Sequence, residues 1–318
     1  MKKILISYPI PEECIEKYKK AFDITLPDHP LSYEEVSGMI ADYDAYFVVG
    51  NKADKNILDK GVKLKAVANF GVGYDNIDWK YATEKKIAVV NTPTQVTDAT
   101  AEHTVALMVD VMRSIARYDR ELREGKWYAP MFTDRNTELT GRTLGIIGFG
   151  RIGKSVAKKA QGLGMNVIYY DMYRCGEQAE KELDVTYMEF EDVLKNSDCI
   201  SLHMPYLPEN YHLFNMEVFK KMKPDAYLIN CARGPIVNEK ELAEALRTGV
   251  IKGAGLDVFE EEPKVSEELK TLENVTLTPH VASATMKARM GMAEEALSGI
   301  AGVLNGEKPV NVVNEEVL

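Results

Sequence analysis

Three polar residues, Arg233, Glu262 and His280, have the side chains that a proton-transfer site needs, and each follows an expected strand. Hydride transfer to or from a carbon that bears oxygen requires a proton donor or acceptor at that oxygen, which His280 can supply. Glu262 beside it would fix the imidazole tautomer and keep a proton on the ring while a ketone is reduced. Arg233 can grip a carboxylate and the adjacent carbonyl oxygen together, which points to 2-oxo and 2-hydroxy acids.

Each of these residues alone also has a simpler structural interpretation. A histidine after a proline at a strand end, as in the segment LTPH, is more often a hydrogen-bonded structural residue. Arg233 can cap a strand at the surface, and Glu260, Glu261 and Glu262 can form a solvated acidic turn. Their joint placement after three strands of one nucleotide domain favours function, because ligands gather at the carboxyl ends of parallel strands.

A glycine loop that binds a dinucleotide is predicted in the segment LTGRTLGIIGFGRIGKSVAKKAQGLGMNVIYYD. Gly148, Gly150 and Gly153 follow an apolar strand directly and open a helix, which makes the G-x-G-x-x-G pattern specific. Gly148 permits the tight turn, Gly150 lets the pyrophosphate approach the backbone, and Gly153 lets the helix pack on the strand. The phosphates then lie at the positive helix N-terminus.

The end of the next strand indicates which dinucleotide is bound. Asp171 is placed to accept hydrogen bonds from the adenine ribose hydroxyls, and its charge would repel a 2′-phosphate. NAD is therefore favoured over NADP. Arg174 weakens this preference, because an arginine near the ribose can meet a phosphate.

The elements that position these residues alternate between short apolar strands and amphipathic helices, so the fold class is α/β with parallel sheets. Helices are expected around 12–20, 32–40 and 56–60, one long helix from Asp98 to Glu124, and a last helix at about 283–304. Strands are expected at Lys3–Tyr8, Ala45–Val49, Ala66–Asn69 and Ala88–Val90, and then at Thr143–Ile147, Asn166–Tyr170, Cys199–His203, Ala226–Asn230, Gly253–Val258 and Val275–Leu277. The second series, with six strands, matches a doubly wound nucleotide domain.

Composition narrows the class of protein. The 318 residues suffice for two domains, and 45% of them are hydrophobic. The net charge of −10 disfavours binding to nucleic acid or to an anionic membrane surface. No segment is apolar over the length that spans a bilayer, and the four single cysteines, without metal-ligand spacing, indicate a cytoplasmic protein with reduced thiols and no metal site.

Together the segments GIIGFGRIG, NCARGPIV, GLDVFEEEP and LTPHVAS resemble the D-isomer-specific 2-hydroxyacid dehydrogenases. The segments NFGVGYDNID and NTPTQVTDATAEH extend the resemblance over nearly the whole chain. The family implies an Arg, Glu and His catalytic set that matches Arg233, Glu262 and His280. It also implies a Rossmann NAD domain, residues 99–287, inserted in a flavodoxin-like substrate domain, residues 1–98 and 288–318.

The resemblance further implies contacts that the residue types alone do not predict. Backbone amides at Val72 and Gly73 would bind the substrate carboxylate. The implied cofactor contacts, beyond the three glycines and Asp171, are Arg151, Ile152, His203, Pro205, Cys231, Ala232, Asp257 and Thr104. Such proteins are commonly homodimers through the NAD domain, here through the helix and loop from Arg113 to Asn136, with Trp127 near the partner's site. His103 is expected to be structural, and His29 and His212 carry no signal.

Departures from related families narrow the substrate. Formate dehydrogenases have a glutamine at the position of Glu262, and phosphite dehydrogenases have a lysine in the loop 72–75, where this chain has none. Formate and phosphite are therefore disfavoured as substrates. Phosphoglycerate dehydrogenases often add a regulatory domain, for which this chain has no room. Glyoxylate, hydroxypyruvate, lactate-like or bulkier 2-oxo acids remain as substrates. Many relatives have a threonine where this chain has Tyr211, so the cofactor contact that the family makes at this position is in doubt here.

The alternative function, from another class of protein, is an NAD-sensing co-repressor of the same fold. The intact catalytic set of arginine, glutamate and histidine disfavours it.

Overall fold

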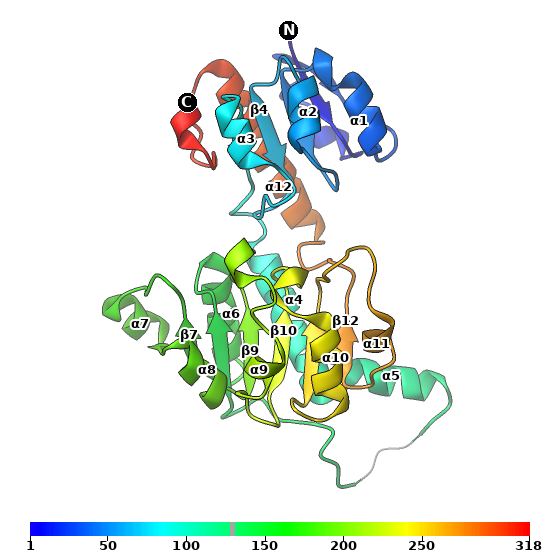
Figure 1. Ribbon diagram of the computed structural model, residues 1–318, viewed down its shortest axis with the longest axis vertical. Coiled ribbons are helices and arrows are strands. Elements are labelled where there is room, and N and C mark those ends of the chain that lie inside the picture. The colour runs from blue at the N-terminus through cyan, green and yellow to red at the C-terminus, as the bar shows by residue number, and fades with distance from the viewer. Residues whose placement is uncertain (128–130) are drawn as a thin grey trace. The chain divides into compact units, whose positions relative to one another are not determined.

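The computed structural model describes residues 1–127 and 131–318 and divides into two compact units (Figure 1). The first unit contains Met1–Val96 and Ala284–Leu318, and the second contains Thr97–Ser283. The second unit is therefore inserted into the first along the chain. Of the segment 113–136, where a subunit contact was expected, residues 128–130 lie outside the described residues.

The first unit is built on a parallel five-stranded sheet of order β2-β1-β3-β4-β5. Its strands are β1 (Lys2–Ile6), β2 (Phe22–Thr25), β3 (Ala45–Val48), β4 (Ala66–Asn69) and β5 (Ala88–Val90). Helices α1 (Tyr33–Met39), α2 (Lys55–Lys60) and α3 (Trp79–Glu84) cover one face, and α12 (Met286–Asn305) covers the other. Along β3, Tyr46 packs under the first group and Phe47 under α12, both fully buried. Because both faces of the sheet are covered, all four residues of β3 are hydrophobic.

The second unit is built on a parallel seven-stranded sheet of order β12-β11-β10-β9-β6-β7-β8. Its strands are β6 (Thr143–Ile147), β7 (Asn166–Tyr170), β8 (Thr186–Tyr187), β9 (Cys199–Leu202), β10 (Tyr227–Asn230), β11 (Gly253–Leu256) and β12 (Val275–Leu277). The chain order reverses at β6, which pairs with both β7 and β9. Such a reversal opens a crevice for ligands at the carboxyl ends of the strands.

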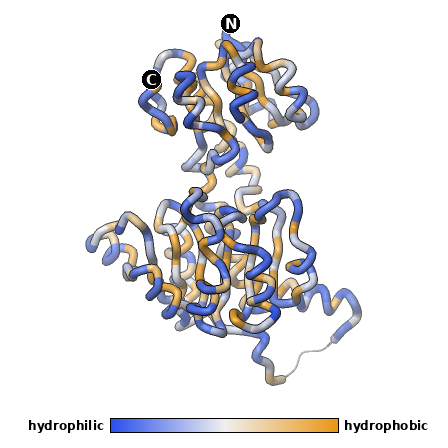
Figure 2. Tube along the Cα trace, viewed as in Figure 1, coloured by the Kyte–Doolittle hydropathy of each residue, from blue (hydrophilic) through white to orange (hydrophobic). Residues whose placement is uncertain are grey.

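Helices cover both faces of the larger sheet (Figure 1). One face carries α8 (Phe190–Asn196), α9 (Met216–Phe219), α10 (Glu239–Arg247) and α11 (Glu267–Lys270), and the other carries α4 (Thr97–Arg113) and α6 (Arg151–Gln161). Two further helices are α5 (Ile115–Arg123) and α7 (Glu177–Leu183). Figure 2 shows that the hydrophobic residues concentrate along the central strands of this unit.

The prediction of one long helix from Asp98 to Glu124 was wrong. The chain forms α4 and α5 with a break at Ser114, whose φ of 55° is left-handed. Polar groups outside the helical ladder stabilise this break: the Asp110 carboxylate accepts from the Ala116 amide at 2.8 Å, and the Met112 carbonyl accepts from the Thr137 amide at 2.8 Å. An unbroken apolar spacing does not reveal such local competition for hydrogen bonds.

Two further expectations need correction. The segment 12–20 forms a 3-10 turn, Glu12–Cys14, followed by turns rather than a helix, because Ile15 and Tyr18 pack into the core just before β2 begins at Phe22. The sequence prediction also missed β2, in which Phe22 and Ile24 alternate with polar residues, and β8, which has only two residues. The larger sheet therefore has seven strands instead of six.

The predicted fold class is confirmed. The order 2-1-3-4-5 in the first unit is flavodoxin-like, and the second unit has the Rossmann order with one additional strand. Within the described residues, no helix combines the length and the apolar character needed to cross a bilayer.

Candidate active site

The candidate catalytic residues lie after three neighbouring strands of the larger sheet. Arg233 follows β10, Glu262 follows β11 and His280 follows β12, and these strands are adjacent and parallel. Parallel strands end at the same edge of a sheet, so the topology brings the three segments together.

Glu262 and His280 form a hydrogen-bonded pair. Nδ1 of His280 lies 2.7 Å from Oε2 of Glu262, and the other carboxylate oxygen accepts from the Phe259 amide at 3.0 Å. Burial raises the pKa of Glu262, but these two hydrogen bonds and the charges of His280 and Arg233 outweigh it and hold the pKa below its ordinary value. Glu262 is therefore an anion at neutral pH, and its charge orients the imidazole so that Nε2 is left for a substrate.

Asp257 holds the loop that carries His280. Its carboxylate is fully buried and accepts from the Thr278 hydroxyl at 2.6 Å and from the amides of Val281 and Ala282 at 2.9 Å each. Its carbonyl oxygen accepts from the His280 amide at 2.8 Å, which stabilises the left-handed backbone of His280, with φ 52°. Burial raises the pKa of Asp257, and these hydrogen bonds, with that of His103, lower it further than burial raises it. The family resemblance implies Asp257 as a cofactor contact, and within the protein its side chain contacts the histidine loop and His103.

Arg233 lies in a turn that packs against the glutamate loop. The Asn230 side chain accepts from the Ala232 amide at 3.0 Å and donates to the Arg233 carbonyl at 2.9 Å, which shapes the turn after β10. A Cβ on the next residue, Gly234, would lie 1.9 Å from the carbonyl carbon of Phe259. No side chain fits in that space, so the arginine turn and the glutamate loop pack backbone to backbone.

A second carboxylate and histidine group, which the sequence analysis missed, supports the same loop. Glu260 bonds His212 through Oε2 at 2.7 Å and accepts from the Glu239 amide through Oε1 at 2.7 Å. The Glu260 amide donates in return to the buried Glu239 carboxylate at 2.5 Å. Burial and the nearby charges of Glu260 and Glu261 raise the pKa of Glu239. The acidic run at 260–262 is thus a hydrogen-bonded loop, and the reading of it as a merely solvated turn does not hold.

The glycine loop is shaped by two of its three glycines. A Cβ on Gly148, whose φ is +94°, would lie 2.5 Å from the Met204 amide, and a Cβ on Gly153 would lie 2.4 Å from the Gly148 carbonyl. A Cβ on Gly150 would meet nothing within 4 Å. Packing inside the protein therefore requires glycine at 148 and 153 but not at 150. Open space over Gly150, the N-cap of α6, fits a pyrophosphate that approaches the helix N-terminus.

Asp171 lies at the end of β7 beside this loop. Its Oδ2 accepts from the Phe149 amide at 2.6 Å and its Oδ1 from the Tyr173 amide at 2.8 Å. Each oxygen keeps a lone pair for a further donor, such as a ribose hydroxyl.

The other expected cofactor contacts lie on the same unit. Arg151 and Ile152 form the first turn of α6, and Pro205 is exposed after β9. Thr104 is buried on α4, where its hydroxyl donates to the Thr100 carbonyl at 2.7 Å, and burial raises the pKa of the nearby Cys231 thiol to about 12. His203 bonds the Ser201 hydroxyl at 2.8 Å, and burial lowers its pKa to about 3, so its ring is neutral. Tyr211 is exposed and stacks on His212 with ring centroids 3.8 Å apart.

In the first unit, Val72 and Gly73 lie in an asparagine-held turn after β4. The Asn91 amide donates to the Val72 carbonyl at 2.8 Å, and Asn69 donates to the Gly73 carbonyl. Asn76 in turn donates to Asn69 at 2.9 Å. The turn therefore has a defined backbone, which a role in anion binding by its amides requires.

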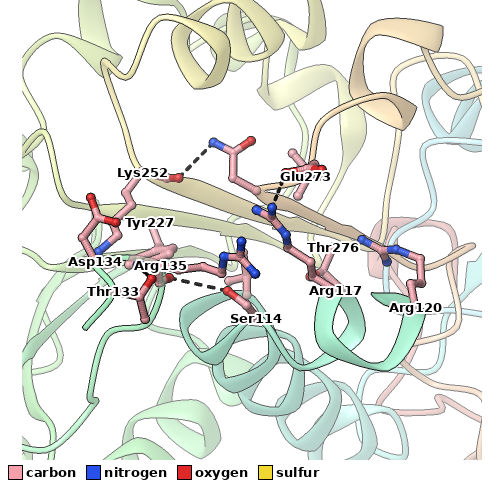
Figure 3. A pocket seen from close by; sticks show the side chains of 13 residues that line it. Ser114, Arg117, Arg120, Thr133, Asp134, Arg135, Tyr227, Lys252, Glu273 and Thr276 are labelled. Carbon is pink, nitrogen blue, oxygen red and sulfur yellow. Dashed lines mark hydrogen bonds and ion pairs between the residues drawn. The ribbon is translucent and has the colours of Figure 1, made fainter. Parts of the chain in front are cut away.

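A cavity of about 320 Å³ lies elsewhere on the second unit (Figure 3). Its lining includes Tyr227 and Val275, the first residues of β10 and β12, so it opens at the amino ends of strands whose carboxyl ends carry the candidate site. Its arginines are largely paired: Arg117 contacts Glu121 and Glu273, and Arg135 contacts Glu121. This cavity is not the candidate active site.

Known proteins are similar to this chain over nearly its whole length. Residues 105–282 match the family model described as "D-isomer specific 2-hydroxyacid dehydrogenase, NAD binding domain". The chain is 44% identical to the glyoxylate reductase of Thermococcus litoralis, over 99% of this chain and 98% of that protein. A solved structure of a Thermus thermophilus protein matches with a TM-score of 0.88 at 33% identity, over 98% of this chain and 99% of the other. An NADPH-dependent glyoxylate/hydroxypyruvate reductase from Sinorhizobium meliloti matches with a TM-score of 0.86 at 30% identity, over 99% of this chain and 98% of the other.

Proposed function

Because this chain belongs to the D-isomer-specific 2-hydroxyacid dehydrogenase family, we propose that it transfers a hydride between NAD(H) and the 2-position of a small D-2-hydroxy or 2-oxo acid. Its similarity to a glyoxylate reductase makes glyoxylate the first substrate to test. The observation that carries the proposal is the hydrogen bond between Nδ1 of His280 and Oε2 of Glu262, at 2.7 Å. This pair follows the two strands next to β10, the strand that Arg233 follows.

In the proposed reaction each side chain has one task. NADH, when bound, supplies the hydride that reaches C2 of the oxo acid. His280 donates a proton from Nε2 to the carbonyl oxygen, so that the product is the neutral alcohol. Glu262 stabilises the imidazolium before this transfer and keeps Nδ1 protonated after it. Arg233 binds the substrate carboxylate and polarises the carbonyl. In the oxidative direction His280 takes the proton back.

The residues around the glycine loop support a dinucleotide as the cofactor. The open space over Gly150 lies at the N-terminus of α6, where backbone amides and the helix dipole favour phosphate. In this proposal Asp171 accepts hydrogen bonds from the adenine ribose hydroxyls, and its charge would favour NAD over NADP.

The substrate carboxylate would also be bound by the amides of Val72 and Gly73. This role rests on the family resemblance and on the turn that Asn69 and Asn91 hold. Peptide amides in that role would favour acids with a free carboxylate over simple ketones.

We propose in addition that two copies of the chain associate through α5 and the segment after it. Large apolar side chains are exposed there: Ile115 and Leu122 to about half of their surface, and Trp127, Met131 and Phe132 to nearly nine-tenths. Exposed apolar residues grouped in one segment are typical of a protein interface. A second copy is the occupant that the family resemblance favours.

A panel of 2-oxo acids, each given with NADH and with NADPH, tests the proposed function. We expect NADH to be oxidised with at least one small acid, such as glyoxylate or hydroxypyruvate, and not with the matching aldehyde or ketone that lacks the carboxylate. Failure to bind either cofactor, measured by nicotinamide fluorescence, would overturn the proposal.

A further inference from the structure

The turn after β7 contains a cation that a 2′-phosphate could use. Arg174 follows Asp171 by three residues, and the bond from the Tyr173 amide to Asp171 at 2.8 Å keeps this turn compact. An arginine at this place can bind the extra phosphate of NADP through a charge-assisted contact. The cofactor preference therefore depends on what the guanidinium of Arg174 already contacts.

Arg174 is engaged by Glu180 on α7 through two parallel hydrogen bonds. Nε of Arg174 lies 2.6 Å from Oε1 of Glu180, and Nη2 lies 2.7 Å from Oε2. The guanidinium carbon also lies 5.2 Å from the centre of the Tyr187 ring. The hydrogen bonds from Arg174 lower the pKa of Glu180 to about 2, against the opposing effect of burial. The pair is therefore fully ionised at neutral pH, and it has the two-point geometry that best fits arginine.

Glu180 is held in place from its other side. Its side chain is 11% exposed, and Oε1 accepts a second hydrogen bond, from the Tyr169 hydroxyl at 2.8 Å. Tyr169 is fully buried and stacks on Phe149 of the glycine loop, with ring centroids 4.0 Å apart. The Cys175 amide donates to the same hydroxyl at 3.1 Å. Glu180 is thus fixed to the core, and it cannot follow Arg174 if the arginine turns to another anion.

We propose that Glu180 determines cofactor specificity in this chain by holding Arg174 away from a 2′-phosphate. To bind a 2′-phosphate through the same two-point edge, Nε and Nη2, Arg174 would have to break both hydrogen bonds and leave the mostly buried carboxylate of Glu180 without its counterion, which is unfavourable. Asp171 adds its own repulsion. The preference for NAD therefore has two parts, a carboxylate that repels the phosphate and a second one that occupies the nearest arginine. The inference rests on the proposed function, in which the adenine ribose lies at Asp171.

The test compares the dissociation constants of NADH and NADPH, measured by nicotinamide fluorescence, for the natural protein and for Glu180→Gln, Glu180→Ala and Arg174→Ala. Glu180→Gln keeps the acceptor for Tyr169 but loses the charge that holds Arg174, and Glu180→Ala removes the acceptor altogether. We expect both to lower the ratio of the NADPH to the NADH constant by about fivefold to tenfold, the effect of one charge-assisted contact. Arg174→Ala alone should change this ratio less than about twofold, because Arg174 is already occupied.

Two controls separate release of Arg174 from other effects. Glu182→Gln removes one negative charge from the same helix, and it should leave the ratio unchanged because Glu182 contacts Gln178 and not the pair. The double variant Arg174→Ala with Glu180→Gln should lose the gain in NADPH binding. An unchanged ratio in folded Glu180→Gln and Glu180→Ala, or selective loss of NADPH binding in Arg174→Ala alone, overturns the inference. Either result leaves the proposed function intact if NADH still binds, whereas failure of the natural protein to bind NADH contradicts the proposed function itself.

Discussion

At the scale of single residues, the candidate site depends on a few carboxylates whose environments differ. Glu262 holds the imidazole of His280, Asp257 holds the two backbone amides that follow His280, and Glu260 holds the loop that carries Glu262. Only Glu262 among them contacts the proposed proton donor by its side chain. The other two act on the reaction through position.

Replacement of Glu262 by glutamine tests its role in proton transfer. The amide would keep the size of the side chain but would not stabilise an imidazolium, so we expect kcat for oxo-acid reduction to fall about 100-fold or more. The Kd of NADH should not change. Steady-state kinetics together with cofactor titration measure both quantities, and a kcat within about threefold of the natural value would contradict the role.

The lowered pKa of Glu262 also predicts how this residue affects stability with pH. Its stabilising hydrogen bonds are fully present above its ordinary pKa of 4.5 and are lost as the pH falls through the lower pKa of the folded protein. The difference in unfolding free energy between the natural protein and Glu262→Gln should therefore be larger at pH 7 than at pH 3. Urea unfolding at the two pH values measures it, and an equal difference at both would show that the charge contributes nothing.

Packing inside the protein does not require a glycine at position 150. An added Cβ meets no protein atom, so Gly150→Ala should leave the thermal midpoint nearly unchanged. It should weaken NADH binding about tenfold or more, because the methyl group occupies space that the pyrophosphate needs to reach the backbone amides. Calorimetry and cofactor titration check the two halves of this prediction, and unimpaired NADH binding would remove the pyrophosphate from this loop.

At the scale of elements, the adjacency of three parallel strands could be predicted from the sequence, and the support of their loops could not. Arg233, Glu262 and His280 each follow a recognisable apolar strand, and the parallel topology then places them at one edge. His212 lies 48 positions from Glu260, in a loop without a period, so nothing in the local pattern pairs them. The break between α4 and α5 at Ser114 depends on hydrogen bonds made by the Thr137 amide and the Asp110 carboxylate. The spacing of apolar residues does not predict such hydrogen bonds.

The close approach of the arginine turn to the glutamate loop yields a prediction about Gly234. A methyl group there would lie 1.9 Å from the Phe259 backbone, so one of the two loops must move. We expect Gly234→Ala to lose about 1–3 kcal/mol of unfolding free energy and most of its activity. Gly38→Ala, on α1 of the first unit, is the matched variant, because an added Cβ there meets no protein atom and the backbone is not left-handed. Full activity in Gly234→Ala would show that this packing does not position the site.

At the scale of the whole molecule, the inserted second unit carries the candidate catalytic residues and the glycine loop, and the first unit carries the turn at Val72 and Gly73. The fold class of both units followed from alternation of strands and helices. The exposed apolar side chains on and after α5 do not belong to either core, and they form the surface through which we propose that two copies associate.

We therefore expect the purified protein to be a dimer. Light scattering coupled to gel filtration should give twice the mass of the chain, and Phe132→Asp should shift it towards the monomer, because a charge would be buried at the contact. The matched variant Val62→Asp, at an exposed position of the first unit, should stay dimeric. A natural protein that is monomeric at micromolar concentration would contradict the proposed interface.

The most direct test of the account is the activity of His280→Ala. We expect this variant to bind NADH with the natural Kd and to lose the oxidation of NADH by 2-oxo acids by about 100-fold to 10,000-fold, because the proton donor is absent. His29→Ala is the matched control, since His29 also pairs with carboxylates, Asp28 and Glu35, but on the exposed surface of the first unit. Loss of turnover in His280→Ala alone, with cofactor binding intact, is the predicted result, and retained turnover in that variant would contradict the mechanism.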